Sequence, residues 1–319
     1  MQPAAQQPPV LHGPTCGPVE AAEAAEVLAL AARAQHADGI EALSEQTLLD
    51  LDVAGPRHWF VHATASPGGG GPGSAPLVAY AQLGTPVDGS RSAELVVDPD
   101  ARRAGIGGAL LDALLAASGS HRLLVWAHGD LPGARALAAR AGLEPVRSLW
   151  RMTRTLDQAV PAVPIDGLRP FVPGQDEDAW VELNRAAFAS HPEQGRLSVA
   201  DLEAREREPW FDPDDLLLLE RDGTAVAYLW LKVEPPDGEL YALGVSPEAQ
   251  GERLGSTLTA RAVAHLAARG LRRAVLYTDA GNTAAVRAYT AAGFRQDRVD
   301  LQYGARAPRT SPEDATMPS

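Results

Sequence analysis

The chain contains one motif twice, at a separation of 148 residues. Residues 94–111 are ELVVDPDARRAGIGGALL and residues 243–259 are LGVSPEAQGERLGSTLT, with matching valine, proline, alanine, glycine and leucine. A second match follows in each copy, ALAARAGL at 136–143 and AYTAAGF at 288–294. A duplicated stretch of this length predicts two similar domains, each with a strand, a loop, a helix, a strand and a helix in that order.

The repeated motif predicts an anion site in each half. An apolar strand leads into a glycine-rich turn that opens a helix, and the unpaired N–H groups and the dipole at a helix start favour negative charge. In the first half the turn is R-x-x-G-x-G, at Arg102, Gly105 and Gly107. It lacks the G-K-S/T ending of the Walker loop and differs from the dinucleotide fingerprint G-x-G-x-x-G.

The motif resembles the signature of the GNAT acetyltransferase superfamily, Q/R-x-x-G-x-G/A, which binds the pyrophosphate of acetyl-CoA. It follows a strand ending in V-x-P in both halves, and the second half continues with LYTDAGNTAAVRAYTAAGF at 276–294. The resemblance implies an α/β fold with a mixed α+β sheet, two tandem GNAT domains, and acetyl-CoA as cosubstrate with no metal. It also implies that Asn282 and Tyr289 lie beside the CoA thioester.

A closer resemblance is to the mycothiol synthase family of tandem GNAT enzymes. The matching segments are SEQ (44–46), ELVVDP (94–99), RAAFASHPEQG (185–195), EPWFDP (208–213), LWLKV (229–233) and GELYALGVSP (238–247). The resemblance implies acetyl transfer to the cysteinyl amine of 1D-myo-inositol 2-(L-cysteinylamino)-2-deoxy-glucopyranoside, abbreviated Cys-GlcN-Ins. Two alternatives stay open: an N-acetyltransferase for another amine, and an acyl-CoA-binding sensor that has lost turnover.

The resemblance assigns acetyl-CoA contacts to both halves. In the first half they are Leu95, Val96, Val97, Arg102, Arg103, Ala104, Gly105, Ile106, Gly107 and Gly108. In the second half they are Leu243, Gly244, Val245, Gln250, Gly251, Glu252, Arg253, Leu254, Gly255, Ser256, Asn282, Thr283, Ala284, Ala285, Val286 and Arg287. We expect the strand residues to pair with the pantetheine as an added strand does, and the turn residues to hold the pyrophosphate.

The resemblance also implies direct attack of a free amine on the thioester. Glu239 is the expected base, acting through water, and Tyr289 is the expected acid, since a phenol can give a proton to a leaving thiolate. By residue type alone, Glu239 is equally a solvated carboxylate at a strand end, and Tyr289 is equally a packing residue. The predicted acceptor-binding residues are Glu45, Glu193, Lys232, Glu239 and Tyr277, each of which could also be an ordinary surface or strand residue.

Differences between the halves assign their roles. The offset of 148 places Arg91 opposite Glu239, and a local offset of 151 places Ala138 opposite Tyr289. The first half therefore keeps a phosphate site but lacks plausible groups for proton transfer. We expect catalysis in the second half and a vestigial or regulatory acetyl-CoA site in the first, which could still form part of the acceptor pocket.

The second half departs from the family pattern at three positions. Arg253 stands where the signature has glycine, so it could obstruct the phosphate, strain the backbone or bind the phosphate directly. Gly281 replaces an expected acidic residue, which removes a helix-capping side chain. Leu231 stands where a small polar residue is expected before Lys232.

Composition and linker signals set the expected domains. The 319 residues suit two domains, 19–156 and 168–304, joined by a proline-rich linker at 157–167. We expect the segments 1–18 and 305–319 to be disordered, because they are rich in proline and polar residues.

Charge and cysteine content exclude several classes of function. A net charge of −13 argues against nucleic acid or an anionic membrane as partner, so a small-molecule substrate is expected. A single cysteine, Cys16, forms no internal disulfide, and neither a secretion signal nor a membrane-spanning run is visible. We expect a cytoplasmic monomer with no metal site.

Overall fold

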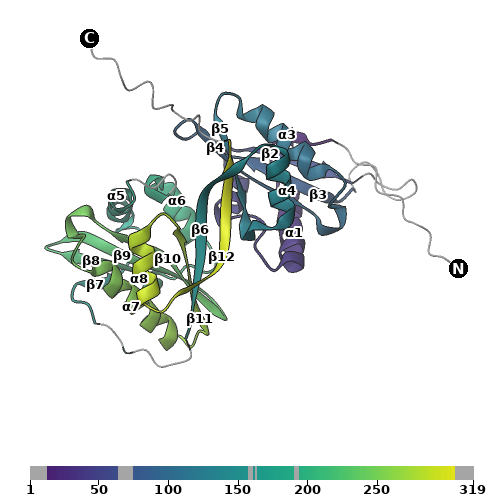
Figure 1. Ribbon diagram of the computed structural model, residues 1–319. Helices are drawn as coiled ribbons and strands as arrows, with labels where there is room; N and C mark the ends of the chain where they lie inside the picture. The colour runs from purple at the N-terminus through teal and green to yellow at the C-terminus, as the bar shows by residue number, and fades with distance from the viewer. Residues whose placement is uncertain (1–12, 64–74, 157–160, 162–163, 190–193, 306–319) are drawn as a thin grey trace, which may run out of the picture. The chain divides into compact units, whose positions relative to one another are not determined.

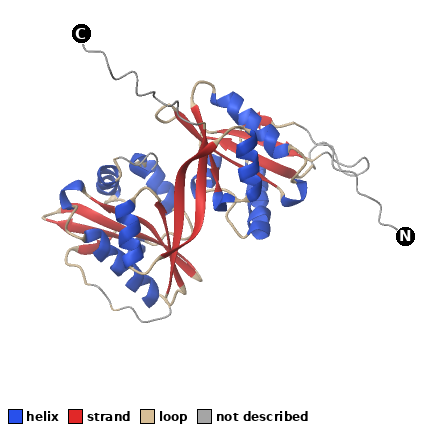
Figure 2. Cartoon of the chain, in the orientation of Figure 1, coloured by secondary structure: helices blue, strands red, loops and turns tan. Residues whose placement is uncertain are grey.

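The computed structural model describes residues 13–63, 75–156, 161, 164–189 and 194–305 (Figures 1 and 2). The described chain forms two compact units. Unit 1 comprises Met1–Ser148 and Asp300–Ser319, and unit 2 comprises Leu149–Val299. No helix in these described ranges is long and apolar enough to cross a membrane.

Unit 1 is a mixed sheet covered by helices on both faces. Its strands, in spatial order, are β1 (Thr15–Gly17), β2 (Arg57–His62), β3 (Leu77–Leu83), β4 (Ser90–Val97), β5 (Arg122–Ala127) and the end of β12 (Arg295–Gly304). Helices α3 (Ile106–Ser118) and α4 (Pro132–Arg140) pack on one face, and α1 (Ala21–Asp38) and α2 (Glu45–Leu49) on the other. Strand β3 is buried along its whole length, which explains its almost continuous apolar sequence.

Unit 2 repeats this arrangement of strands and helices. Its strands, in spatial order, are the end of β6 (Glu144–Thr155), β11 (Arg273–Asp279), β10 (Asp237–Val245), β9 (Thr224–Glu234), β8 (Leu216–Arg221) and β7 (Leu168–Pro170). Helices α7 (Leu254–Ala268) and α8 (Thr283–Ala291) cover one face, and α5 (Glu177–Ala187) and α6 (Val199–Glu206) cover the other. The predicted class, a mixed α/β sheet in two similar halves, is confirmed.

The last strand of each half belongs to both units. Strand β6 starts in unit 1, but its residues from Leu149 to Thr155 pair with β11 in unit 2. Strand β12 starts in unit 2, and its residues from Leu301 to Gly304 pair with β5 in unit 1. The compact units therefore differ from the predicted boundaries 19–156 and 168–304 in these final strands, because pairing partners outweigh position in the sequence.

Both halves contain the predicted order of strand, loop, helix, strand and helix: β4, α3, β5 and α4 in the first, and β10, α7, β11 and α8 in the second. One expectation was wrong: Thr15–Gly17, within the segment 1–18 expected to be disordered, form the edge strand β1 and pair with β2. Residues 1–12 and 306–319, and the linker residues 157–160, 162 and 163, lie outside the described residues.

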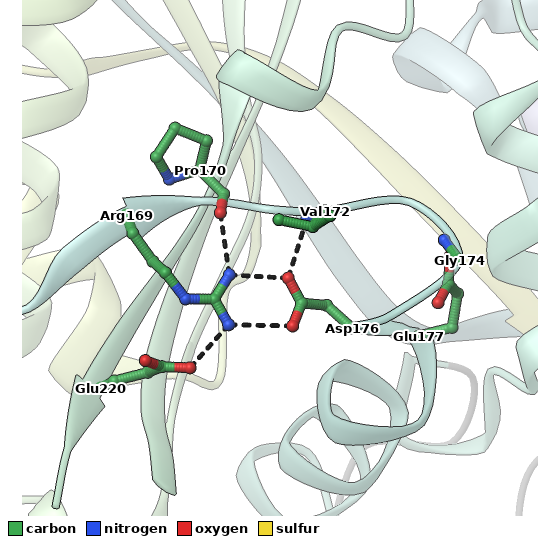
Figure 3. Close-up of polar contacts among 7 residues, drawn as sticks. All are labelled: Arg169, Pro170, Val172, Gly174, Asp176, Glu177 and Glu220. Atoms are coloured by element: carbon green, nitrogen blue, oxygen red, sulfur yellow. Dashed lines mark hydrogen bonds and ion pairs between the residues drawn. The ribbon is translucent and has the colours of Figure 1, made fainter. Parts of the chain in front are cut away.

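An ion-pair cluster fastens the edge strand β7 to α5 and β8 (Figure 3). Arg169 donates hydrogen bonds to both carboxylate oxygens of Asp176, at 2.6 and 2.8 Å, and to Glu220 at 2.6 Å. The Asp176 carboxylate also accepts the N–H of Val172 at 2.8 Å. The hydrogen bonds from Arg169 lower the pKa of Asp176. These bonds hold the short strand β7 against β8 and the start of α5.

The HPEQG motif ends in a glycine that packing requires. A Cβ placed on Gly195 would lie 2.2 Å from the carbonyl oxygen of Phe188, far inside contact distance. The buried amide of Asn184 fixes the same turn, since its Nδ2 donates to the carbonyl of Gln194 at 2.6 Å. The Oδ1 of Asn184 accepts the hydroxyl of Tyr228 at 2.8 Å, which links the turn to β9.

We predict that Gly195→Ala destabilises the protein by about 1–3 kcal/mol, because the added methyl must displace the backbone of Phe188. Gly133→Ala is the matched control, since a Cβ on Gly133 in α4 has no neighbour within 4 Å. Denaturant unfolding of both variants tests this. Equal stability of the two variants would contradict the tight approach at Gly195.

Candidate active site

Strands β10 and β11 separate after a short paired stretch. Asp237 to Leu240 pair in parallel with Arg273 to Leu276, but β10 continues to Val245. On its other edge β10 stays paired with β9 as far as Val245. The edge of Leu243–Val245 toward β11 therefore leaves the ladder, and its backbone groups are placed to pair with an extended ligand. In unit 1 the ladder of β4 and β5 also ends early, at Ala93 and Val125.

The turn after β10 presents the start of α7 to an anion. Gly251 and Arg253 both adopt left-handed backbone conformations, with φ of 88° and 64°. Arg253 is the N-cap residue of α7 and makes no capping hydrogen bond with its side chain. The first N–H groups of the helix, at residues 254–256, have no partner within it and carry the positive end of its dipole. This geometry fits the predicted pyrophosphate turn.

Unit 1 has the same backbone turn with arginine and glycine exchanged. Arg103 and Gly105 have φ of 68° and 86°, and they stand 148 residues before Gly251 and Arg253. Arg253 thus adopts the conformation that the signature reserves for glycine, at a cost of about 1–2 kcal/mol. Of the three possibilities raised by the sequence for Arg253, the structure shows the strained left-handed backbone.

In both units the side chain of the first signature residue donates a hydrogen bond to the last carbonyl of the preceding strand. Arg102 donates from Nε to the carbonyl of Val97 at 3.2 Å, and Gln250 donates to the carbonyl of Val245 at 3.3 Å. Arg102 also pairs with both carboxylate oxygens of Asp38, at 2.8 and 2.7 Å. Because Asp38 neutralises this guanidinium, the backbone N–H groups are the stronger anion donors of the unit 1 turn.

Asn282 caps α8, the helix that carries Tyr289. Its Oδ1 accepts the N–H of Ala285 at 3.1 Å. Asp279 accepts the N–H of Gly281 at 2.8 Å. Gly281 supplies no capping side chain, but the helix keeps a cap because Asn282 provides it. Residues 283–287, predicted to contact CoA, form the start of this helix.

Tyr289 lies against the core of unit 2. Its ring meets that of Phe294 edge-on, with centroids 6.1 Å apart. Burial raises the pKa of Tyr289 to about 12. The phenol therefore keeps its proton at neutral pH, as a proton donor to a thiolate requires.

Glu239 stands beside a β-bulge. It pairs with Lys232 across the ladder of β9 and β10, and the register shifts by one residue between Leu240 and Ala242. Tyr241 is the extra residue, and a bulge of this kind re-aims neighbouring side chains. Strand β4 of unit 1 pairs with β3 from Val97 to Ala93 without any such shift.

Because of the bulge, the residue of unit 1 that is equivalent to Glu239 differs from the one expected from the sequence. A constant offset of 148 placed Arg91 opposite Glu239. Because unit 1 has no extra residue, its equivalent of Glu239 is Ser92, whose carbonyl accepts the N–H of Gly84 at 2.8 Å. Gly84 stands 148 residues before Lys232, the partner of Glu239. Unit 1 therefore has a neutral side chain at this position.

An aromatic cluster lies on the same face of the sheet as Glu239 and Lys232. Lys232 Nζ is 4.8 Å from the ring centroid of Trp210, and Trp210 packs on Tyr241 with centroids 5.0 Å apart. Arg205, a buried residue of α6, donates from Nε to the hydroxyl of Tyr241 at 2.8 Å. The sequence reasoning used EPWFDP only as a family marker and assigned no role to Trp210, Tyr241 or Arg205.

The other predicted acceptor residues fall in different places. Alternation along β11 puts Tyr277 on the face of Val275, which pairs with Glu239. The hydroxyl of Tyr277 accepts a hydrogen bond from Arg298 at 2.7 Å. Glu45 is the first residue of α2, in unit 1. Glu193 lies outside the described residues. Unit 2 thus brings Lys232, Glu239 and Tyr277 to one face of its sheet.

Unit 1 contains a buried cluster of titratable groups that the sequence did not indicate. His128 lies between the carboxylates of Glu94 and Asp300, at 3.4 and 3.5 Å. Glu94 also accepts the N–H of Ser44 at 2.7 Å, and Asp300 accepts the N–H of Gly129 at 2.7 Å. Unit 1 thus has titratable groups that the sequence analysis did not identify, and their charge states decide what they can do.

Electrostatics fix the charges of this cluster. Burial alone would lower the pKa of His128, but attraction to Glu94 and the hydrogen bond with Asp300 outweigh it and raise that pKa to about 10. Burial alone would raise the pKa of Glu94, but the charge of His128 and the N–H of Ser44 lower it. The imidazole is therefore held as a cation, which suits it to structure rather than to general-base catalysis at neutral pH.

Curated relatives match the chain over almost its whole length. A protein of Sanguibacter keddieii named mycothiol acetyltransferase is 48% identical, with 94% of this chain and 96% of that protein covered. A protein of Cellulomonas flavigena with the same name is 47% identical, with 94% and 90% covered. The family model for the acetyltransferase (GNAT) family matches residues 178–294.

Solved structures share the fold. A GCN5-related N-acetyltransferase from Sphaerobacter thermophilus has a TM-score of 0.65 at 24% identity, covering 92% of this chain and 96% of its own. A tandem GNAT protein from the clavulanic acid biosynthesis pathway has a TM-score of 0.64 at 20% identity, covering 93% and 99%. Two tandem GNAT domains, as the sequence predicted, describe the architecture.

We predict that Arg253→Gly stabilises the protein by up to about 1 kcal/mol, since relief of the left-handed strain exceeds the added backbone freedom of glycine. Arg103→Gly should behave alike, because Arg103 has the same kind of φ. Arg261→Gly, inside α7, is the control and should lose about 1 kcal/mol. A loss of stability in Arg253→Gly, measured by denaturant unfolding, would mean that its side-chain contacts outweigh the strain.

We predict that the free energy of unfolding declines from pH 7 to pH 9 in the wild type. The folded state keeps a proton on His128 that the unfolded chain releases above about pH 6.5, so stability falls by at most about 1.4 kcal/mol per pH unit. The contribution is complete below about pH 6.5 and is lost as pH rises toward 10. Glu94 acts in the opposite direction, because its contribution is lost on acidification below about pH 4.5.

His128→Asn should flatten this decline, and His121→Asn, a change in the same unit, should preserve it. Denaturant unfolding at pH 6, 7.5 and 9 makes the comparison. An equal decline in wild type and His128→Asn would show that other groups cause it.

Proposed function

The chain belongs to the mycothiol acetyltransferase family of GNAT N-acetyltransferases, and on this premise we propose that it acetylates the cysteinyl amine of Cys-GlcN-Ins with acetyl-CoA to give mycothiol. The family name of its relatives, at 44–48% identity, supports the acceptor. The observation that carries the proposal is the position of Glu239 and Lys232 on one ladder, beside the separated strands β10 and β11 of unit 2.

We propose that the two halves divide the work. The half from residue 168 to 304 carries Glu239 and Tyr289, whereas the half from 19 to 156 has Ser92 and Ala138 at these places. The first half keeps the same turn at Arg103 and Gly105, so its proposed role is to bind acetyl-CoA without catalysis.

The proposed acetyl-CoA site of unit 2 follows from three features already described. The free edge of Leu243–Val245 suits the amide groups of pantetheine, and the turn of residues 250–256 suits the pyrophosphate. The start of α8, from Asn282 to Arg287, borders the same strands at the end of β11. In unit 1, residues 95–97 and 102–108 form the equivalent set.

In the proposed reaction, the acceptor nitrogen attacks the thioester carbonyl and forms the new C–N bond. Glu239 takes the amine proton through a water molecule. The C–S bond then breaks, and the CoA thiolate takes a proton from Tyr289, whose pKa of about 12 keeps it protonated until then. Acetyl moves from sulfur to nitrogen. Glu239 then gives its proton to solvent and Tyr289 takes one from solvent, so the net change is one proton moved from the amine to CoA and an enzyme restored to its starting state.

We propose that carboxylates and a lysine hold the acceptor. Glu239, Lys232 and Tyr277 lie on one face of the unit 2 sheet. The family resemblance also assigned Glu45 and Glu193 to the acceptor; Glu45 lies in unit 1, and Glu193 lies outside the described residues. Carboxylates accept hydrogen bonds from sugar hydroxyls and from an amine, while a lysine donates to hydroxyl and carbonyl oxygens.

We predict that purified protein converts acetyl-CoA and Cys-GlcN-Ins to mycothiol, detected by mass spectrometry. Glu239→Gln should lower kcat/KM by about 100-fold or more, since it removes the proposed base. Tyr289→Phe should also lower it, with full affinity for acetyl-CoA. Glu203→Gln, an exposed carboxylate of α6, is the matched control and should turn over like the wild type.

Each result that contradicts these expectations would favour a different mechanism or function. Equal turnover in the wild type and Glu239→Gln would remove Glu239 from the mechanism. Acetylation of a different amine in preference to Cys-GlcN-Ins would make the protein an N-acetyltransferase for that amine. Binding of CoA without any product would favour the acyl-CoA sensor.

A further inference from the structure

Two side-chain contacts hold Lys232 on its face of the sheet. Its Nζ is 4.8 Å from the ring centroid of Trp210, within the range of a cation–π interaction. The same nitrogen is 3.2 Å from the Glu234 carboxylate. Only 16% of the lysine side chain is exposed, so its charge is poorly screened by water. Across the ladder it stands directly opposite Glu239.

The Trp210 ring is held in place by two neighbouring aromatic rings. Its ring packs on Trp230 and Tyr241, with centroids 5.9 and 5.0 Å away. Trp230 is fully buried, and Tyr241 accepts a hydrogen bond from the buried Arg205. The indole is therefore a rigid platform, and the ammonium above it is held in place relative to Glu239.

The Lys232 charge, partly offset by the exposed Glu234 carboxylate at 3.2 Å, acts on an amine that binds beside Glu239. An α-amine is largely protonated below its usual pKa of about 7.7–8.0, and the ammonium form cannot attack a thioester. A like charge within about 4–6 Å disfavours the protonated form and releases the nucleophile. Lys232 therefore promotes release of the ammonium proton to solvent when the acceptor binds, and Glu239 accepts the second proton, which the nitrogen loses as the C–N bond forms.

We infer that Trp210 is a positioning residue for the transfer: it holds the Lys232 ammonium opposite Glu239, so that the acceptor binds as its free amine. This inference rests on the proposed function, because it takes Glu239 to be the group that faces the reacting nitrogen. Trp210 itself touches no reacting atom in this assignment.

The other charged groups near this face are accounted for by element. Asp212 and Asp215, in the segment after Trp210, are paired with Arg269 and, for Asp215, also with His265. Titratable or charged groups on the neighbouring elements include Glu234 on β9, Glu239 and Tyr241 on β10, Asp201, Glu203, Arg205 and Glu206 on α6, Tyr277 on β11 and Arg298 on β12, and Glu208 lies just before Trp210. Lys232 is the cation directly across the ladder from Glu239.

The test is the pH profile of kcat in four variants. Lys232→Met should move the acidic limb upward by about one pH unit. Trp210→Leu should move it in the same direction by a smaller amount, because the ammonium is no longer held. Trp210→Phe retains an aromatic face and should keep the wild-type limb. Trp126→Leu, which removes a comparable contact with Arg147 in unit 1, is the matched control.

A second readout does not depend on turnover. Calorimetry at pH 6.5, in two buffers of different ionisation enthalpy, counts the protons released when Cys-GlcN-Ins binds to protein saturated with CoA. The wild type and Trp210→Phe should release more protons than Trp210→Leu and Lys232→Met.

The outcomes separate the inference from the function on which it rests. Acetylation with the same acidic limb and the same proton release in all variants overturns the role of Trp210 and Lys232 alone. A Trp210→Leu variant whose kcat falls equally at every pH also overturns it, because that loss is structural. A wild-type protein that neither binds nor acetylates Cys-GlcN-Ins overturns the proposed function, and the inference with it.

Discussion

The separation of β10 and β11 is the constraint on which the candidate site depends. A parallel pair that stayed in register to its end would leave no backbone edge for a ligand. Here the pairing stops at Leu240 and Leu276, while β9 keeps β10 in place on the other side. The close approach of Tyr228 adds to this support, since a Cβ on Gly244 would lie 2.3 Å from its ring. Strand β10 is thus rigid on one edge and open on the other.

The two units show how one backbone plan can carry different chemistry. Their phosphate turns follow the same left-handed path, although glycine and arginine are exchanged between the two positions. On the opposite face they differ in kind. Unit 1 pairs Gln82 with Glu94 across its ladder, where unit 2 pairs Trp230 with Ala242. Unit 1 therefore uses this face for a buried ion cluster, and unit 2 uses it for an aromatic wall behind Lys232.

Features with a local sequence signal could be predicted. The buried strand Leu77–Leu83 is apolar throughout, and the cap of α8 is an asparagine at the expected place. The bulge at Tyr241 left no such signal, because one extra residue in β10 does not disturb the apolar pattern on either side. The cluster of His128 and Asp300 joins residues 172 apart in the chain, beyond the reach of any spacing rule.

The sequence by itself determined the duplication, the mixed α/β class and the two glycine-rich turns, while the roles of Glu239 and Tyr289 stay proposals from the family resemblance. The duplication, the class and the turns follow from short motifs, whose physics is set by neighbours along the chain. Only the tertiary structure decided which strands close each sheet, which residue of unit 1 matches Glu239, and how Trp210 holds Lys232. Strand register and packing between distant segments depend on the free energy of the whole fold. They cannot be deduced from the sequence of any single segment.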